Sequence, residues 1–350
     1  MAGRRAVVLF NLGGPDGPKS VEPFLFNLFR DPAIISLPNP FRWMLAKAIS
    51  RKRATIAQAI YAQMGGGSPL VKETQDQAAA LEALLNQDGD DETRVFICMR
   101  YWHPMSRQVA KDVANFDPDT VVLLPLYPQF STTTSESSLA DWRQAAARAK
   151  VVATERAVCC YPTAPGLIEA QADLVAKGIE AAKPSGKPRV LFSAHGLPKK
   201  VIAGGDPYQW QVEQTSAAVA AKLAERGMAD LDWVVCYQSR VGPLEWIGPS
   251  TEDEIKRGGA DGVPLVVVPI AFVSEHSETL VELDIEYGHV AEAAGVPAYH
   301  RVPTVGTHPA FMAELAGIVR AAAGAAQVCG CADGKRLCPA GFGRCIHQET

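Results

Sequence analysis

Residues 264–287 read PLVVVPIAFVSEHSETLVELDIEY, and this stretch decides the fold. Its first half contains the apolar run 265–270, which is rich in β-branched residues and predicts a short strand buried on both faces of a parallel sheet. The second half turns abruptly acidic. If 275–287 forms an α-helix, its four glutamates fall within about 80° of one another on one face; they are Glu275, Glu278, Glu282 and Glu286.

The acidic half also carries a histidine, His276. In an open parallel sheet, ligands bind just beyond the carboxyl ends of the strands, which is where this half is expected to lie. A row of carboxylates beside an imidazole can accept protons or a cation there. The alternative, an ordinary solvated helix face with one histidine, carries equal weight on this stretch alone.

Composition limits the class of protein. The chain has 350 residues, which favours two domains, and its hydrophobic and charged contents of 47% and 21% are those of a globular enzyme. The net charge of −4 and the lack of a basic stripe argue against nucleic acid as a partner. No apolar run approaches the roughly 20 residues of a membrane span, and the run near the start is too short for a signal peptide. A cytoplasmic enzyme is therefore expected.

Strands and helices alternate along the whole chain, which predicts an α/β fold with parallel sheets. The two halves also begin alike, because residues 8–15 read VLFNLGGP and residues 190–198 read VLFSAHGLP. We therefore expect two similar lobes facing a common cleft, at 1–160 and 161–323. Residues 324–350 form a separate cysteine-rich tail.

His195 stands at the end of a predicted strand and is followed by glycine. That position exposes an imidazole, so a proton-accepting role is favoured over a structural one. The loops that follow the strands are aromatic, which is typical of a cleft for a large, flat, apolar ligand. Nearby side chains able to meet anionic groups on such a ligand include Arg100, Ser131 and Thr132.

The cysteines divide into two groups. Cys98 and Cys236 lie in or beside apolar runs and read as inert core residues. The other six look like ligands in a reducing compartment; they are Cys159, Cys160, Cys329, Cys331, Cys338 and Cys345. Thiolates at this density suit a [2Fe–2S] cluster or tetrahedral zinc, although the C-x-C-x6-C-x6-C spacing fits no standard zinc module. A disordered tail with redox-sensitive thiols is the alternative.

Residues 31–53 combine apolar and aromatic side chains with prolines and end in the basic cluster 51–53. Such a segment can form a lip that touches a bilayer, or a core helix with a solvated basic end.

Eight motifs follow one another in an order that resembles ferrochelatase: NLGGP (11–15), GGGSP (65–69), RYWHP (100–104), YPQFSTTT (127–134), LFSAHGLP (191–198), GDPY (205–208), YQSRVGPLEWIGP (237–249) and PIAFVSEHSETLVELDIEY (269–287). The resemblance implies two Rossmann-like lobes with a porphyrin between them. It also implies insertion of ferrous iron into protoporphyrin IX, the last step of haem synthesis.

On this resemblance, His195 matches the family's essential histidine, assigned either to removing pyrrole protons or to binding the metal. Glu278 matches its essential glutamate, and His276 matches the histidine two residues earlier. Glu275, Glu282 and Glu286 then line a path for protons or metal. The remaining substrate contacts implied are Leu12, Arg100, Tyr101, Ser131, Thr132, Trp246 and Phe272.

The resemblance also bears on the tail. Animal relatives use a cysteine where this chain has Thr132, and that cysteine is one of four holding a [2Fe–2S] cluster. Some bacterial relatives combine three tail cysteines with one from the body of the chain, here Cys159 or Cys160. The resemblance therefore favours a [2Fe–2S] cluster on four of the six cysteines, and relatives with clusters are often homodimers.

Three other functions fit the sequence less well. A chelatase for coproporphyrin or sirohydrochlorin requires more cationic contacts than these aromatic loops offer. A non-catalytic porphyrin or haem carrier has no need for both His195 and Glu278. A nicotinamide-dependent dehydrogenase is disfavoured because residues 11–15 lack the G-x-G-x-x-G spacing.

Overall fold

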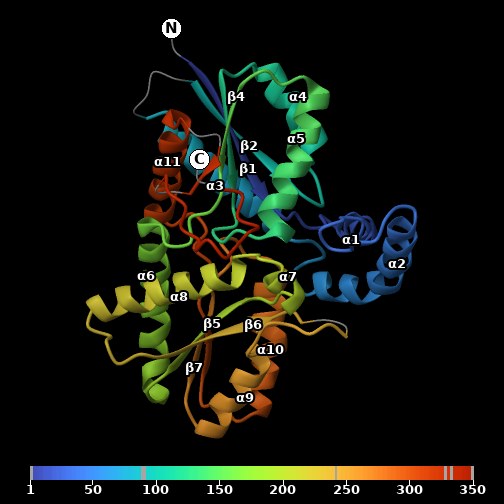
Figure 1. Cartoon of the computed structure of the whole chain (residues 1–350). Helices are drawn as coiled ribbons and strands as arrows, with labels where there is room; N and C mark the ends of the chain where they lie inside the picture. The colour runs from blue at the N-terminus through green and yellow to red at the C-terminus, as the bar shows by residue number, and fades with distance from the viewer. Residues whose placement is uncertain (1–2, 88–91, 241–242, 327–328, 332–333, 348–350) are drawn as a thin grey trace. The chain divides into compact units, whose positions relative to one another are not determined.

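The computed structural model of the chain describes residues 3–87, 92–240, 243–326, 329–331 and 334–347. It divides into two compact units, which are seen with their strands and helices in Figure 1. The first comprises Met1–Cys160, Leu315–Leu337 and Ile346–Thr350, and the second comprises Tyr161–Glu314 and Cys338–Cys345. The tail, expected as a separate segment, thus contributes residues to both units.

The first unit is built on a five-stranded parallel sheet in the order β2-β1-β3-β4-β9. Strand β1 is buried from Ala6 to Asn11, as its apolar run predicts, and pairs with β2 on one side and β3 on the other. The strands are β1 (Arg4–Asn11), β2 (Glu92–Met99), β3 (Thr120–Pro125), β4 (Thr154–Val158) and β9 (Cys329–Gly330).

Helices cover both faces of this sheet. On one face, α4 and α5 bury apolar side chains against β1 and β3, and the Phe10 and Trp142 rings meet edge to face at 6.2 Å. Figure 1 shows α11 on the opposite side of the sheet from α4 and α5. The helices are α1 (Val21–Phe29), α2 (Phe41–Ala62), α3 (Leu70–Leu85), α4 (Ser106–Phe116), α5 (Ser137–Ala149) and, from Leu315 onward, α11 (Pro309–Gly324), with a short 3₁₀ turn at Pro18–Ser20 and a π turn at Thr132–Glu136.

The second unit has a four-stranded parallel sheet in the order β6-β5-β7-β8. Its central strand is flanked on both sides and is buried except at its two ends, Arg189 and His195. All five residues of β7 are buried, as the continuous apolar run of residues 265–270 predicted. The strands are β5 (Arg189–His195), β6 (Asp232–Gln238), β7 (Leu265–Pro269) and β8 (Tyr299–Arg301).

One face of this second sheet packs against α6 and α8, and the other packs against α9, α10 and a π-helix at residues 278–286. Apolar positions at helical spacing account for this, for example Leu283 and Ala291 against the strands. The elements are α6 (Pro165–Ala182), α7 (Lys199–Ala203), α8 (Tyr208–Glu225), α9 (Thr251–Asp261), the π-helix (Glu278–Glu286) and α10 (Tyr287–Ala293), with a 3₁₀ turn at Lys183–Ser185.

The two sheets share one strand order. In each unit the first strand is central, the second lies on one side of it, and the third and fourth lie on the other. The strand order therefore reverses between β1 and β3, and again between β5 and β7. In open parallel sheets, ligands bind beyond the carboxyl ends of strands at such reversals. The prediction of an α/β fold with parallel sheets is confirmed.

One local expectation was wrong. The acidic stretch was expected to be an α-helix that includes Glu275, but residues 278–286 form a π-helix with i→i+5 bonding, and Glu275 lies in the loop before it. The pattern of apolar and polar residues cannot distinguish these helix types, because both place residues four apart near the same face.

Among the described residues, no helix is both long and apolar enough to span a bilayer.

Candidate active site

His195 is the last residue of β5, and its side chain is 37% exposed at the carboxyl end of the sheet. The Tyr208 hydroxyl donates to the His195 carbonyl at 3.1 Å and fixes the strand end. Residue 196 must be glycine, because a Cβ there would lie 2.9 Å from the Gln238 carbonyl and 3.3 Å from the Trp246 ring. The backbone at Gly196 therefore packs directly against that of Gln238, to whose carbonyl its N–H donates at 2.9 Å.

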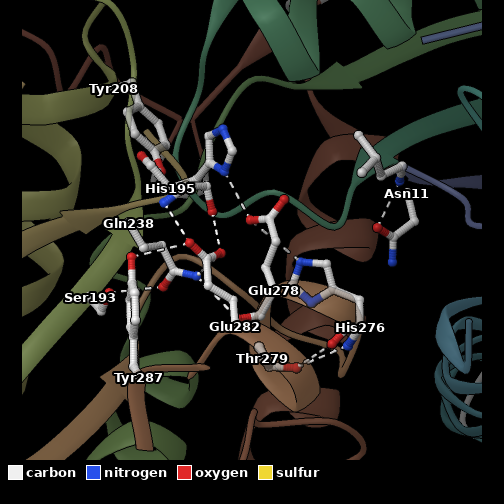
Figure 2. A network of polar contacts seen from close by, with 12 residues as sticks. Asn11, Ser193, His195, Tyr208, Gln238, His276, Glu278, Thr279, Glu282 and Tyr287 are labelled. Carbon is white, nitrogen blue, oxygen red and sulfur yellow. Dashed lines mark hydrogen bonds and ion pairs between the residues drawn. The ribbon is translucent and has the colours of Figure 1, made fainter. Parts of the chain in front are cut away.

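Glu278 begins the π-helix and lies between two imidazoles, as Figure 2 shows. Its Oε2 is 2.9 Å from His195 Nδ1 and 4.0 Å from His276 Nε2. Residues predicted from separate motifs are thus brought together, because β5 and β7 are hydrogen-bonded neighbours whose carboxyl ends meet.

This contact sets the charge of the pair. Burial on its own would lower the pKa of His195, but the charge of Glu278 and its hydrogen bond outweigh burial and leave that pKa raised. Burial likewise opposes ionisation of Glu278, yet His195 lowers the pKa of that carboxyl to about 2. The contact therefore favours an imidazolium paired with a carboxylate.

His276 differs from His195. It is buried, its ring meets the edge of Phe272 at 4.5 Å, and burial lowers its pKa so that it stays neutral. Among the described residues, no partner is found for its buried Nδ1. Thr279 holds the backbone of His276 through both the N–H and the carbonyl. The site therefore places two imidazoles with oppositely shifted pKa values around a single carboxylate.

Glu282 lies one turn further along the π-helix and accepts four hydrogen bonds, part of the network in Figure 2. The donors are the Ser239 N–H at 2.8 Å, the Ser239 hydroxyl at 2.5 Å, the Gln238 amide at 3.1 Å and the Tyr287 hydroxyl at 3.2 Å. Burial, together with the charge of Glu278, nevertheless raises the pKa of Glu282. Ser239 has a φ of 59°, in the left-handed region that is uncommon for a non-glycine residue.

Gln238 and Ser239 were not singled out as site residues in the sequence. The available signal was their place at the end of β6, next to β5 in the sheet. Gln238 also donates to the Glu278 carbonyl at 3.1 Å and accepts from the buried Ser193 hydroxyl at 2.8 Å. It thus links the strand β5 to the start of the π-helix.

The other two glutamates of the predicted row are separated in the structure. Glu286 is exposed at the end of the π-helix. Glu275 is turned toward β8, where Arg301 donates to its Oε1 at 2.6 Å and the Thr304 N–H donates to the same oxygen at 2.9 Å.

Several of the predicted substrate contacts belong to the first unit. There the buried Asp31 carboxylate accepts hydrogen bonds from Arg100 at 2.7 Å, the Tyr101 hydroxyl at 2.8 Å and the Ser137 hydroxyl at 2.5 Å. Arg100 also donates to Ser137 at 2.8 Å. Arg100 and Tyr101 therefore share Asp31 as a partner, which no sequence pattern revealed.

The remaining predicted contacts have simpler surroundings. Leu12 follows β1, and its N–H donates to the Asn11 side chain, which is held by Thr74. Ser131 is buried and caps the π turn that begins with the half-buried Thr132. In the second unit, the Trp246 ring lies close to Gly196, the residue after His195, and Phe272 packs on His276.

A cysteine group lies at the edge of the first unit's sheet. Strand β9 pairs in parallel with β4, and this pairing brings Cys331 to Cys159 and Cys160. The three sulfur atoms are buried and lie within 4.8 Å of one another, with Cys160 and Cys331 at 3.5 Å. Hydrogen bonds from the two neighbouring thiols lower the pKa of Cys331. In the second unit, the Gln211 amide donates to Cys338 at 3.0 Å.

The sequence reasoning missed one neighbour of this group. His347 is buried, and its Nδ1 lies 3.4 Å from the Cys331 sulfur and 3.3 Å from the Cys331 N–H. The signal that could have identified it is its spacing, two residues after Cys345.

The family model for ferrochelatase matches residues 4–323. The chain belongs to the ferrochelatase family. The ferrochelatase of Phenylobacterium zucineum is 56% identical over 342 residues, covering 97% of each chain. That of Caulobacter vibrioides is 57% identical over 327 residues, covering 93% of this chain and 92% of the relative. Members of the ferrochelatase family are metal chelatases, lyases that insert iron into a porphyrin, so the expectation of such an enzyme is confirmed.

Solved chelatase structures share the fold. SirB from Bacillus subtilis, solved with Fe³⁺, gives a TM-score of 0.52 at 14% identity, covering 93% of this chain and 96% of SirB. A sirohydrochlorin chelatase SirB from Bacillus subtilis subspecies spizizenii, in complex with cobalt, gives 0.50 at 13% identity, covering 91% and 95%. The ferrochelatase family and these chelatases thus have similar α/β architectures.

The His195–Glu278 pair yields a prediction for Glu278→Gln. Without the carboxylate, burial dominates, so the pKa of His195 should fall from above its usual 6.5 to below it. NMR titration of the His195 ring measures this shift. An unchanged or higher pKa in the variant would contradict the assigned pair.

The same variant should lose stability in a defined pH range. Because the pKa of His195 is raised on folding, its contribution to the free energy of unfolding is fully present below about pH 6.5. Because the pKa of Glu278 is lowered, its contribution is fully present above about pH 4.5. The stability difference between wild type and Glu278→Gln should therefore be largest between those values. It should shrink as pH rises through the His195 pKa or falls toward about 2.

Proposed function

We propose that the chain inserts ferrous iron into protoporphyrin IX to give protohaem. The observation that carries this proposal is the contact between His195 and Glu278 at the carboxyl end of β5. A porphyrin loses two N–H protons when it takes up Fe²⁺, so the site needs both a proton acceptor and a cation ligand. An imidazole and a carboxylate in contact provide both, and both bind iron.

The charges of the pair suggest an order of events. Fe²⁺ approaching Glu278 offsets the negative charge that keeps the proton on His195. His195 then releases that proton, and its neutral ring can take one from a pyrrole nitrogen. Release to solvent and a second transfer complete the loss of two protons as iron enters the ring. Neutral His276, also near Glu278, adds a nitrogen that does not repel the cation.

Glu282 and Glu286 extend this machinery along the π-helix. The raised pKa of Glu282 suits a group that passes a proton on, and Glu286 is exposed to solvent. We propose that they carry protons or iron between the pair and solvent. Trp246 and Phe272 offer apolar surface for a flat macrocycle near His195 and His276.

The first test is an anaerobic assay with ferrous iron and either protoporphyrin IX or coproporphyrin III, followed by absorbance. Wild type should metallate protoporphyrin IX faster. His195→Ala and Glu278→Gln should each lower kcat at least about 100-fold, the order expected for loss of acid–base catalysis. His289→Ala, at an exposed histidine of the same unit, should leave kcat unchanged.

Each alternative gives another result in this assay. Faster metallation of coproporphyrin III would make the chain a coproporphyrin ferrochelatase. Tight haem binding without metallation of either porphyrin would identify a carrier. An active His195→Ala protein would remove the proposed base.

We further propose a resident [2Fe–2S] cluster. The donor set fits, because three buried cysteines at one point, one with a lowered pKa, are soft ligands of the kind that hold iron–sulfur clusters. Cys331 together with Cys159 or Cys160 would hold it, and the other ligands of the four would come from Cys329, Cys338 and Cys345. When bound, the cluster supplies covalent iron–sulfur bonds between the tail and the end of β4.

Metal and sulfide analysis tests the cluster. Protein purified without oxygen should contain about two iron atoms and two sulfides per chain. Cys331→Ser should lose most of both, whereas Cys98→Ala should retain them, since Cys98 lies in the core beside Ser106. One zinc per chain without sulfide would show that the cysteines form a zinc site and would overturn the cluster proposal. Protein with neither iron nor zinc would show that the cysteines hold no metal.

We also propose peripheral contact with a membrane through the helix α2 and the segment before it. Large apolar side chains are exposed there, with Phe41 64%, Met44 61% and Trp43 50% accessible. Basic residues at 51–53 lie on the same helix. Exposed apolar and basic groups together are typical of surfaces that lie on anionic bilayers.

Sedimentation with vesicles containing anionic lipid tests this contact. Phe41→Ser combined with Met44→Ser should reduce the bound fraction several-fold, and high salt should weaken binding of wild type. Val152→Ser is the matched control, because Val152 is 86% exposed elsewhere in the same unit. Equal binding by both variants and wild type would exclude this surface.

A further inference from the structure

Arg301, the last residue of β8, binds two carboxylates that lie before and after Glu278 in the sequence. Its Nη1 donates to Glu275 Oε1 at 2.6 Å. Its Nε and Nη2 donate to the two oxygens of Asp284, each at 2.7 Å. The side chain is only 11% exposed, so the guanidinium is held largely away from water.

The two partners of Arg301 are placed around Glu278. Glu275 directly precedes His276 and lies three residues before Glu278, whereas Asp284 lies within the π-helix, six residues after it. One guanidinium therefore ties the loop that enters the π-helix to the body of that helix. Both are anchored on β8, whose neighbour β7 leads into the same loop.

The π-helix depends on contacts with the surrounding structure, of which the Arg301 ion pairs are one set. Its wider turn is rare and occurs mostly as short pieces at functional sites, held by surroundings rather than by intrinsic preference. In the other direction, Glu278 is held by His195 and by Gln238. On the β8 side, the Tyr299 hydroxyl holds the Leu283 carbonyl at 2.7 Å and the Thr304 N–H holds Glu275 at 2.9 Å, but Arg301 contacts both the loop and the helix. The 2.9 Å contact between Glu278 and His195 depends on the placement of this segment.

The charges agree with this reading. Burial opposes ionisation of Glu275, but Arg301 more than offsets it and lowers the pKa of that carboxyl. The side chain of Glu275 is only 16% exposed. Glu275 is therefore committed to an ion pair, in contrast to Glu278, which faces the imidazoles.

We propose that Arg301 is a positioning residue for iron insertion. It clamps Glu275 and Asp284 so that Glu278 stays aligned with His195. Glu275 then serves as an anchor of the loop and carries neither protons nor iron. This inference rests on the role of Glu278 in the proposed reaction, which Glu278→Gln in the same assay tests separately.

The experiment measures kcat and the porphyrin KM for Arg301→Gln, Arg301→Lys, Glu275→Gln and the double variant Arg301→Gln/Glu275→Gln. Arg301→Gln should lower kcat at least 10-fold and change KM less than 3-fold. Arg301→Lys should recover part of the loss, because an ammonium keeps the charge but cannot bind two carboxylates with a planar fork. Glu275→Gln should retain at least a tenth of wild-type kcat.

The double variant separates an anchor from a carrier. If Glu275 is an anchor, removing its charge relieves the unpaired buried carboxylate left by Arg301→Gln, so the double variant should be at least 3-fold more active than Arg301→Gln. If Glu275 carries protons or iron, Glu275→Gln alone should be nearly inactive and the double variant no better.

Arg226→Gln is the matched control, since Arg226 also joins two carboxylates of the second unit, Asp173 and Glu169. It should keep wild-type kcat. The proposal fails if Arg301→Gln is fully active, if its loss matches the unfolded fraction seen by circular dichroism, or if it raises KM alone. Should Arg301→Gln not fold, Glu275→Gln decides, because near-complete loss of kcat in that variant overturns the anchor role.

Discussion

The contact between His195 Nδ1 and Glu278 Oε2 is the interaction on which the rest of the structure depends. It requires two strands from different motifs to be neighbours, so that the loop after β7 reaches the end of β5. Parallel pairing satisfies this, because it places the carboxyl ends of both strands at one edge. The buried valines and leucines of the second sheet thus matter to the chemistry mainly by fixing which side chains meet.

That contact also explains why the site is so heavily hydrogen-bonded. A carboxylate held with a pKa near 2 beside a second carboxylate with a raised pKa is a stable arrangement only if the surroundings divide the charges between them. Gln238 and Ser239 supply donors to Glu282, and His195 contacts Glu278. The unusual φ of Ser239 is consistent with backbone geometry determined by the site.

Much of this was visible in the sequence, for reasons that differ by element. Strand β7 was predicted because a short, continuous apolar run rich in β-branched residues favours a buried strand over a helix. The family was predicted from motifs spread over most of the chain. The π-helix was not, because its pattern equals that of an α-helix. Partnerships such as Glu275 with Arg301 and Arg100 with Asp31 were invisible, since each joins residues far apart in sequence whose meeting is decided by packing.

Strand β9 has a consequence for the order in which the molecule forms. Strand β4 is an edge strand until residues 329–330 pair with it, and the residues of the second unit, 161–314, intervene in the chain. During synthesis, the first unit's sheet therefore has an open edge while the whole of the second unit is being made. Open edges pair readily with other chains, so this interval is when the growing polypeptide is most exposed to misassembly.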